Sequence, residues 1–263
     1  MTALSGTVLL TGASGGIGHA IARALAPHSA ELILSGRRRE LLEPLAAELR
    51  ARAIAADLSR REDVDRLVEQ AGQVDVLIAN AGLPASGLLV ELTQEEIDRM
   101  LEVNLRAPIA LARALTPGMA ERRRGHLVFV SSLQGKAPTP VSSVYCATKF
   151  GLRGFALALR EDLHGHDVGV SVVLPGFIRD AGMFADSGVT LPPGVGTRAP
   201  QDVARAVISA VQRNRAEVEV APIGLRLGTA IASVAPAFGA AVSRRLGSER
   251  IATSVVAGQR EKE

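Results

Sequence analysis

The chain has 263 residues, of which 47% are hydrophobic and 22% charged, the ordinary mixture of a folded globular protein. A net charge of +3 and only seven aromatic residues (six Phe and one Tyr) argue against a nucleic-acid partner, which needs a continuous basic face with interleaved aromatics. One cysteine, Cys146, excludes an intramolecular disulfide, and the sequence has neither a secretion signal nor an apolar run of about 20 residues. We therefore expect a cytoplasmic protein for which membrane contact is not indicated.

Short apolar runs alternate along the chain with longer blocks of helical spacing. Leu41, Leu42, Leu45 and Leu49, for example, recur three and four residues apart, as on one face of a helix. Strands that alternate with helices predict a parallel sheet covered on both faces, in a doubly wound α/β fold. The runs predicted to be strands are Thr7–Leu10, Glu31–Ser35, Ala53–Ala56, Asp75–Ala79, His126–Val130, Gly169–Leu174 and Glu217–Ala221.

No linker or repeat divides the sequence, so we expect one domain over residues 1–263 with an apolar C-terminal extension at 223–263. Pro236 predicts that Leu225–Val242 forms two short helices instead of one. The stretch Phe177–Pro200 is rich in glycine and proline, and long loops of this kind are often functional lids. We expect Phe177, Met183 and Phe184 to cover a ligand, with Gly182, Gly188, Gly194 and Gly196 permitting movement and Pro192 and Pro193 stiffening the far end.

The first predicted strand runs into a glycine-rich turn, Gly12-Ala13-Ser14-Gly15-Gly16-Ile17-Gly18, which a predicted helix follows. Glycines let the backbone turn tightly and approach a pyrophosphate, and a helix N-terminus presents free N–H groups to that anion. The position between a strand and a helix favours a dinucleotide site over a plain turn.

Tyr145 and Lys149 are four residues apart, which places them on one face of a helix. An ammonium near a phenol lowers the pKa of that phenol, so Tyr145 is a candidate acid/base. Ser132 ends the fifth strand and could donate to a substrate oxygen, with its neighbour Ser131 as the rival.

The order and spacing of six motifs resemble those of the short-chain dehydrogenase/reductase family over roughly residues 5–180. These motifs are Gly-x-x-x-Gly-x-Gly, Asn80-Ala81-Gly82, Asn104, Ser132, Tyr-x-x-x-Lys and Pro175-Gly176. The resemblance implies a Rossmann fold and hydride transfer between a nicotinamide cofactor and an alcohol or ketone. It gives Lys149 a contact with the nicotinamide ribose and places Asn104 in a proton relay through a water. The residues it implies for cofactor binding are Gly12, Ser14, Gly16, Ile17, Gly18, Arg37, Asp57, Leu58, Asn80, Ala81, Gly82, Tyr145, Lys149, Pro175, Gly176 and Ile178.

The second strand ends at Gly36-Arg37, where NAD-binding relatives carry an acid for the ribose hydroxyls. Arg37 can instead pair with a 2′-phosphate, which favours NADP, with NAD as the alternative. The resemblance gives Asp57 a contact with the adenine amino group. Asp180 stands where the family usually has a threonine that holds the nicotinamide carboxamide, so the geometry of this loop is open.

The candidate substrate-pocket residues Leu83, Leu133, Val141 and Phe177 are apolar, which favours a small hydrophobic alcohol or ketone. The alternatives are a regulatory protein that binds cofactor without catalysis and a peripheral membrane-associated reductase. His164 and His166 lack further partners, so no metal site is expected, and Cys146 is interpreted as a packing residue. The resemblance also implies a homodimer or tetramer, built on helices predicted at Glu95–Ala120 and Val144–His164, whose apolar residues are Ile97, Leu101, Leu105, Ile109, Phe150, Phe155 and Leu159.

Overall fold

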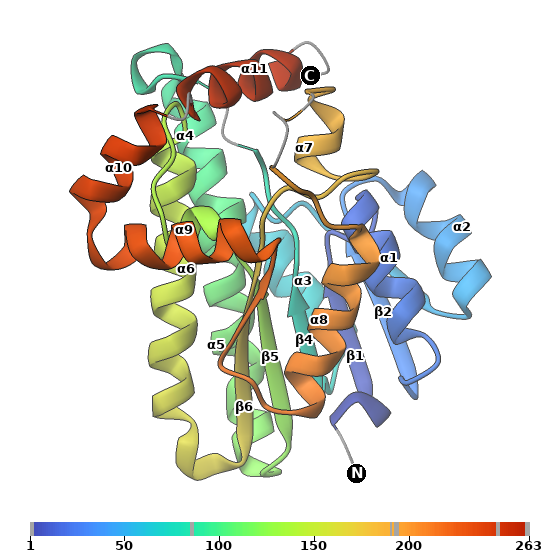
Figure 1. The fold of residues 1–263 in the computed structure, drawn as a ribbon. Helices are drawn as coiled ribbons and strands as arrows, with labels where there is room; N and C mark the ends of the chain where they lie inside the picture. The colour runs from blue at the N-terminus through green and yellow to red at the C-terminus, as the bar shows by residue number, and fades with distance from the viewer. Residues whose placement is uncertain (1–2, 85–86, 190, 192–194, 246–247, 261–263) are drawn as a thin grey trace.

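The computed structural model describes residues 3–84, 87–189, 191, 195–245 and 248–260. Seven parallel strands form one sheet in the order β3-β2-β1-β4-β5-β6-β7, so the chain crosses over between β3 and β4 (Figure 1). All seven predicted strands are confirmed, and each predicted end is at most one residue from the observed one. The strands are β1 (Thr7–Thr11), β2 (Glu31–Gly36), β3 (Arg52–Ala55), β4 (Val76–Ala79), β5 (Gly125–Val130), β6 (Val168–Pro175) and β7 (Glu217–Val220).

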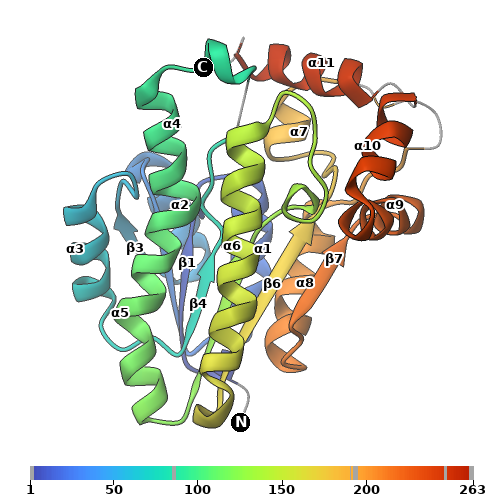
Figure 2. The ribbon, with the colours of Figure 1, turned by 90° about the vertical axis from the view of Figure 1, so that its left-hand side faces the viewer.

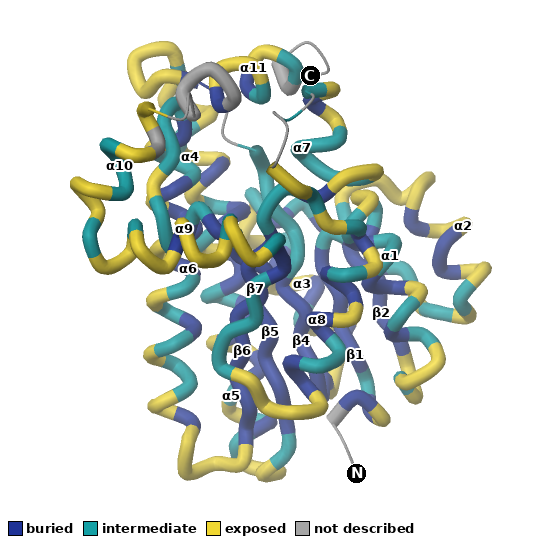
Figure 3. Tube along the Cα trace, viewed as in Figure 1, coloured by how far each residue is buried: buried dark blue, intermediate teal, exposed yellow. Residues whose placement is uncertain are grey.

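Helices cover both faces of the sheet, as the doubly wound prediction requires (Figure 2). Successive strand residues point to opposite faces, so Leu9, Leu77 and Leu127 pack on one side while Val8 and Ile78 pack on the other. The central strands are therefore buried along their length (Figure 3). One face carries α3 (Arg61–Ala71), α5 (Ala107–Glu121) and α6 (Ser143–Asp162); the other carries α1 (Gly16–Leu25), α2 (Arg39–Leu49) and α8 (Pro200–Gln212).

The helix predicted at Glu95–Ala120 is not a regular α-helix. It consists of α4 (Gln94–Leu101), a π-helical turn over Glu102–Arg106, and α5. A π-turn holds one extra residue and changes the face on which its side chains lie, and such turns are frequent at functional sites. Here the turn contains Asn104.

The predicted lid segment has local structure. It contains the short helix α7 (Met183–Asp186) and a β-bridge between Ile178 and Arg198, and the rings of Phe177 and Phe184 lie 5.0 Å apart. Pro192, Pro193 and Gly194 lie outside the described residues. Movement of this segment on ligand binding stays a prediction.

The apolar extension forms three helices, α9 (Ile223–Val234), α10 (Pro236–Arg245) and α11 (Ser248–Arg260). The predicted division at Pro236 is confirmed, because the proline opens α10. Helix α11 lies across the end of the molecule beside α7 (Figures 1 and 2), where Gly258 contacts the Ser187 carbonyl. Among the described helices, none combines the length and the hydropathy that crossing a membrane requires.

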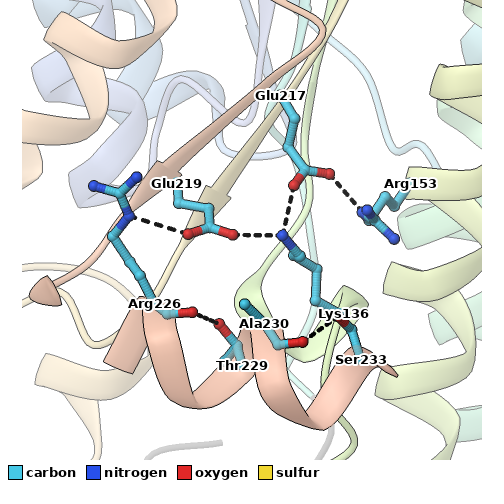
Figure 4. A network of polar contacts seen from close by, with 8 residues as sticks. All are labelled: Lys136, Arg153, Glu217, Glu219, Arg226, Thr229, Ala230 and Ser233. Carbon is cyan, nitrogen blue, oxygen red and sulfur yellow. Dashed lines mark hydrogen bonds and ion pairs between the residues drawn. The ribbon is translucent and has the colours of Figure 1, made fainter. Parts of the chain in front are cut away.

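Helix α9 is tied to the sheet and to the loop after β5 by a polar network (Figure 4). Lys136 Nζ donates to Glu217 Oε1 at 2.8 Å and to Glu219 Oε1 at 2.5 Å, Arg153 donates to Glu217, and Arg226 donates to Glu219. Burial opposes the charge on Lys136, but the two carboxylates outweigh it and raise the pKa of this lysine. The network therefore joins four separate segments of the chain: the loop after β5, α6, β7 and α9.

Candidate active site

The candidate catalytic residues meet where the parallel strands end. Ser132 is the second residue after β5, Tyr145 and Lys149 lie on the first turns of α6, and Asn104 comes from the π-turn between α4 and α5. These segments are distant in sequence, but the carboxyl ends of neighbouring parallel strands share one edge of the sheet. The structure thus brings the predicted residues into one cluster.

Lys149 is 3% exposed, and its ammonium donates to the Val130 carbonyl at 3.2 Å. Its Nζ lies 5.4 Å from the centre of the Tyr145 ring, within cation–π range. The neighbouring backbone is held by Ser131, whose hydroxyl donates to the Lys149 carbonyl at 2.9 Å. Burial disfavours the charged form and lowers the pKa of Lys149 to about 8.

Burial also dominates the electrostatics of Tyr145, whose pKa it raises to about 12. A hydrogen bond between the Ser132 and Tyr145 hydroxyls acts in the opposite direction but is smaller. From the neighbouring ammonium we expected a lowered pKa for Tyr145, whereas in the protein alone the cost of burying a phenolate raises it. Of the two serines, Ser131 faces the backbone of α6 and Ser132 faces Tyr145.

Asn104 is fully buried, and its carboxamide binds both backbone groups of Leu83. Oδ1 accepts from the Leu83 N–H at 2.6 Å, and Nδ2 donates to the Leu83 carbonyl at 2.9 Å. Nδ2 also lies 3.5 Å from the Thr148 hydroxyl, which itself donates to the Tyr145 carbonyl. The side chain of Asn104 therefore fixes the chain that follows Asn80-Ala81-Gly82 against the first turn of α6.

The glycine-rich turn makes contacts that only glycine allows. Gly12 has a φ of 66°, and a β-carbon there would lie 2.7 Å from the Ala81 Cα. A β-carbon at Gly18 would overlap the Gly12 carbonyl, whereas one at Gly15 would meet this oxygen at an ordinary 3.6 Å. The turn therefore exposes backbone instead of side chains before the N-terminus of α1, as a pyrophosphate cradle requires.

Thr11 holds the glycine-rich turn to the end of β4, a role that the motif reading did not assign. Its buried hydroxyl accepts from the N–H groups of Asn80 at 3.1 Å and Ala81 at 3.2 Å. In return, Asn80 Nδ2 donates to the carbonyls of Thr11 and Gly12, each at 3.2 Å. The sign of this role in the sequence is a hydroxyl residue at the end of the first strand, directly before a glycine.

Gly36 leaves room for Ser14, because a β-carbon at position 36 would lie 2.8 Å from the Ser14 hydroxyl. An acid for ribose hydroxyls would not fit there without movement. Arg37 next to it is exposed, and its charge helps to lower the pKa of Asp57. Burial acts to raise this pKa, but hydrogen bonds from Ser59 and the arginine charge together outweigh it. The structure therefore places Arg37, which follows β2, near Asp57, which follows β3. Leu58, the next residue in the chain, is buried.

The chain after β6 contacts the glycine-rich turn. Ala181 lies directly against Gly16, and Gly182 lies against Ile17. Ile178 is 3% exposed and packs into the core, so its side chain is not available to a ligand. Asp180 is turned away: its side chain is 70% exposed and lies 3.3 Å from Arg179, so the carboxylate does not take the place of the usual threonine side chain.

Cys146 beside Tyr145 is a buried packing residue, as expected. It is 7% exposed, and burial raises the pKa of its thiol, which keeps the sulfur in its unreactive form.

The sequence profile described as short chain dehydrogenase matches residues 6–190 of the chain. A curated relative, the ketoacyl reductase HetN of Nostoc sp., is 40% identical over 230 residues, which are 84% of this chain and 80% of the relative. Among solved structures, a short-chain dehydrogenase from Sphingobium yanoikuyae in complex with NADPH is similar with a TM-score of 0.75, 30% identity, and coverage of 81% of this chain and 87% of that one. A 3-ketoacyl-(acyl-carrier-protein) reductase from Brucella melitensis complexed with NADH has a TM-score of 0.73 and 28% identity, over 82% and 96% of the two chains.

The close contacts of the glycine-rich turn predict unequal effects of the same substitution. Gly18→Ala should destabilise the protein by about 1–3 kcal/mol, because the added methyl forces α1 away from the Gly12 carbonyl. Gly15→Ala is the matched control and should change the free energy of unfolding by less than about 1 kcal/mol, because its backbone is extended and its surroundings are open. Urea denaturation of both variants measures the difference, and equal effects would contradict the contact described.

Proposed function

The chain belongs to the short-chain dehydrogenase family, and we propose that it reduces a ketone with NADPH, using Tyr145 as the proton donor. The observation that carries the proposal is the cluster of Ser132, Tyr145 and the buried Lys149 beside a glycine cradle at the same edge of the sheet. The similarity to a ketoacyl reductase supports reduction of a ketone. Similarity to structures with NADPH and with NADH supports NADP as the cofactor, with NAD as the alternative.

The residues present fit such a cofactor. Gly12, Gly16 and Gly18 would leave the backbone free to approach the pyrophosphate, and Arg37 would pair with the 2′-phosphate. Asp57 would bind the adenine amino group, and Lys149 the nicotinamide ribose. When bound, the reduced cofactor supplies a hydride to the carbonyl carbon of the substrate.

The chain's own residues then manage the charge on the substrate oxygen. Ser132 holds the carbonyl oxygen by a hydrogen bond, and the Tyr145 hydroxyl donates its proton to that oxygen as the alcohol forms. The phenolate left on Tyr145 is stabilised by the Lys149 ammonium and is later protonated from solvent. A pKa of about 12 for Tyr145 is compatible with ketone reduction, because the hydroxyl stays protonated throughout the neutral range.

We propose a positioning role for the Asn104 side chain. A relay through its carboxamide would compete with the two hydrogen bonds to Leu83. These bonds set the distance between the chain after β4 and the turn of α6 that carries Tyr145.

We also propose a homodimer through α4, α5 and α6. Leu101 and Phe150 are 37% and 39% exposed in the single chain, which leaves apolar surface on these helices. Phe155 is not part of that surface, because it packs edge-on against the buried Phe129 with ring centres 5.5 Å apart. Sedimentation at micromolar concentration tests the proposal, and a monomer would overturn it.

Tyr145→Phe should lower kcat for ketone reduction by about 100-fold or more while NADPH binding and the melting temperature change little, because only the proton-donating hydroxyl is lost. The measurement is the loss of NADPH absorbance with a panel of ketones. Ser131→Ala is the matched control for a buried hydroxyl and should retain most of the activity. Reduction at half the original rate by Tyr145→Phe would refute the assignment, and no reduction by the unaltered protein would favour a non-catalytic binding protein.

The pH dependence should reveal Lys149. Its pKa of about 8 means that the ammonium is present below that pH and is lost above it. Because the ammonium stabilises the phenolate formed during reduction, kcat/KM should be level below pH 8 and fall above it, although Tyr145 is still protonated there. Lys149→Arg should lower the rate but remove this fall, since guanidinium keeps its charge. A fall centred near pH ~10 in the unaltered protein would point to an ordinary lysine instead.

Arg37→Ala should weaken NADPH binding by about 10- to 100-fold, the worth of a charge-assisted hydrogen bond to a phosphate, and leave NADH binding within about twofold. Arg39→Ala is the control, because Arg39 is an exposed residue of α2 that lies 3.6 Å from Glu43. Fluorescence titration with both cofactors measures the effect. Equal weakening of NADPH and NADH would show that Arg37 has a structural role.

A further inference from the structure

The C-terminal extension forms an apolar groove beside the candidate active site. The groove has a volume of about 380 Å³, within the range of sites for small organic ligands. Its walls are α9, α10, the chain around Val195 and Gly196, and the loop after Ser132. Of the described residues that line it, none is charged: Ala137, Pro138, Val195, Gly196, Pro222, Gly224, Leu225, Gly228, Thr229, Ile231, Ala232, Pro236, Phe238, Gly239, Ala240 and Val242.

One end of the groove reaches the catalytic strand ends. A β-carbon at Gly176 would lie 3.2 Å from a methyl of Leu225 in the groove and 3.1 Å from a methyl of Leu133, the residue after Ser132. Ala137 and Pro138 belong to the loop that runs from Ser132 to Tyr145. The groove is therefore lined in part by the loop that joins Ser132 to the helix of Tyr145.

The network of Figure 4 fixes this arrangement. Lys136, in the same loop as Ala137, is held by Glu217 and Glu219 of β7, and Glu219 also accepts from Arg226 of α9 at 3.1 Å. The side chains of Lys136 and Glu219 are each 12% exposed, so the ion pair between these two residues is largely shielded from solvent. Helix α9 is thus anchored to the catalytic loop.

None of the described residues covers three large apolar side chains of the groove. Ile231, Phe238 and Val242 line it and are 51%, 60% and 39% exposed. Thr229 supplies a hydroxyl, but that hydroxyl donates to the Arg226 carbonyl within α9. A ligand that covers these side chains gains free energy from apolar burial alone, without a charged or hydrogen-bonding group.

We propose that this groove binds the unbranched alkyl chain of the substrate, so that the ketone reduced at Tyr145 carries a long apolar tail. This proposal rests on the proposed function, because a ketone held at Tyr145 decides which end of the substrate enters the groove. Residues 222–242, which supply most of the groove, lie beyond the segment matched by the family profile, residues 6–190.

Two glycines of α9 keep the groove open. Gly224 and Gly228 are one helical turn apart, both line the groove, and a β-carbon at either position would meet no other atom within 4 Å. A leucine at position 228 can therefore occupy groove space without displacing the backbone. Ala230 lies on the same helix, is exposed and does not line the groove, so Ala230→Leu is the matched control.

The test compares 3-oxobutyryl, 3-oxooctanoyl and 3-oxododecanoyl thioesters of N-acetylcysteamine as substrates. Each methylene buried in the groove is worth about fourfold in kcat/KM, so the octanoyl-to-dodecanoyl step should raise this value by at least ~10-fold. Gly228→Leu should lose this rise and keep its activity toward the short thioester, whereas Ala230→Leu should resemble the unaltered protein. Equal kcat/KM for the two longer thioesters, or an undiminished rise in Gly228→Leu, would overturn the proposal. If Gly228→Leu does not fold, Gly224→Leu takes its place.

A binding measurement separates the groove from the chemistry. Cis-parinaric acid, an unbranched chain whose fluorescence increases in apolar surroundings, should bind the unaltered protein and Ala230→Leu but bind Gly228→Leu at least ~10-fold more weakly. This result without reduction of any thioester would retain the groove and reject the proposed function. Equal binding by all three proteins would reject the groove. A change of sedimentation coefficient in Gly228→Leu with unchanged chain-length dependence would instead assign the groove to a contact between copies.

Discussion

The candidate site depends on one unfavourable burial, that of the Lys149 ammonium beside the Tyr145 ring. Lowering the pKa of a lysine from about 10.5 to about 8 corresponds to about 3 kcal/mol against the charged form. The Val130 carbonyl, which accepts from the ammonium, offsets part of this cost, and the backbone of Lys149 is held close to Gly135, where a β-carbon would lie 2.7 Å from the Lys149 carbonyl oxygen. The result is an ammonium close to its titration point beside a phenol that stays protonated at neutral pH, so the proposed proton donor is in its protonated form there.

The parallel sheet gathers the groups that surround this pair. Thr11 at the end of β1 holds the chain after β4, and that chain is held in turn by Asn104 from the π-turn. The chain after β6 reaches back to the glycine-rich turn through Ala181. Because these contacts join successive strand ends, the cradle and the proton donor occupy fixed places relative to each other. The extension past β7 adds an apolar surface to this shared edge and is anchored there by ion pairs.

Much of this arrangement could be predicted from the sequence. Strand positions follow from apolar runs bounded by glycine or charge, and Tyr-x-x-x-Lys places its two residues on one helix face whatever the surroundings. Tertiary effects could not be read in the same way. Local spacing gives no sign that burial raises the pKa of Tyr145, that the Asn104 helix contains a π-turn, or that Asp180 turns to solvent. The groove depends on how α9 crosses α10 at Ala232 and Gly239, a contact between helices that periodicity within each helix does not specify.

The pKa of Lys149 is the quantity that tests this account most directly. The chain has three lysines, Lys136, Lys149 and Lys262, so a protein labelled with ¹³C at the lysine ε-carbon gives a spectrum simple enough to assign with Lys149→Arg. The account predicts that the resonance lost in this variant titrates with a midpoint near 8, while that of Lys136 titrates above the ordinary lysine value. A Lys149 resonance that titrates at about 10.4, the value of a lysine in water, would contradict the buried charge on which the proposed proton transfer depends.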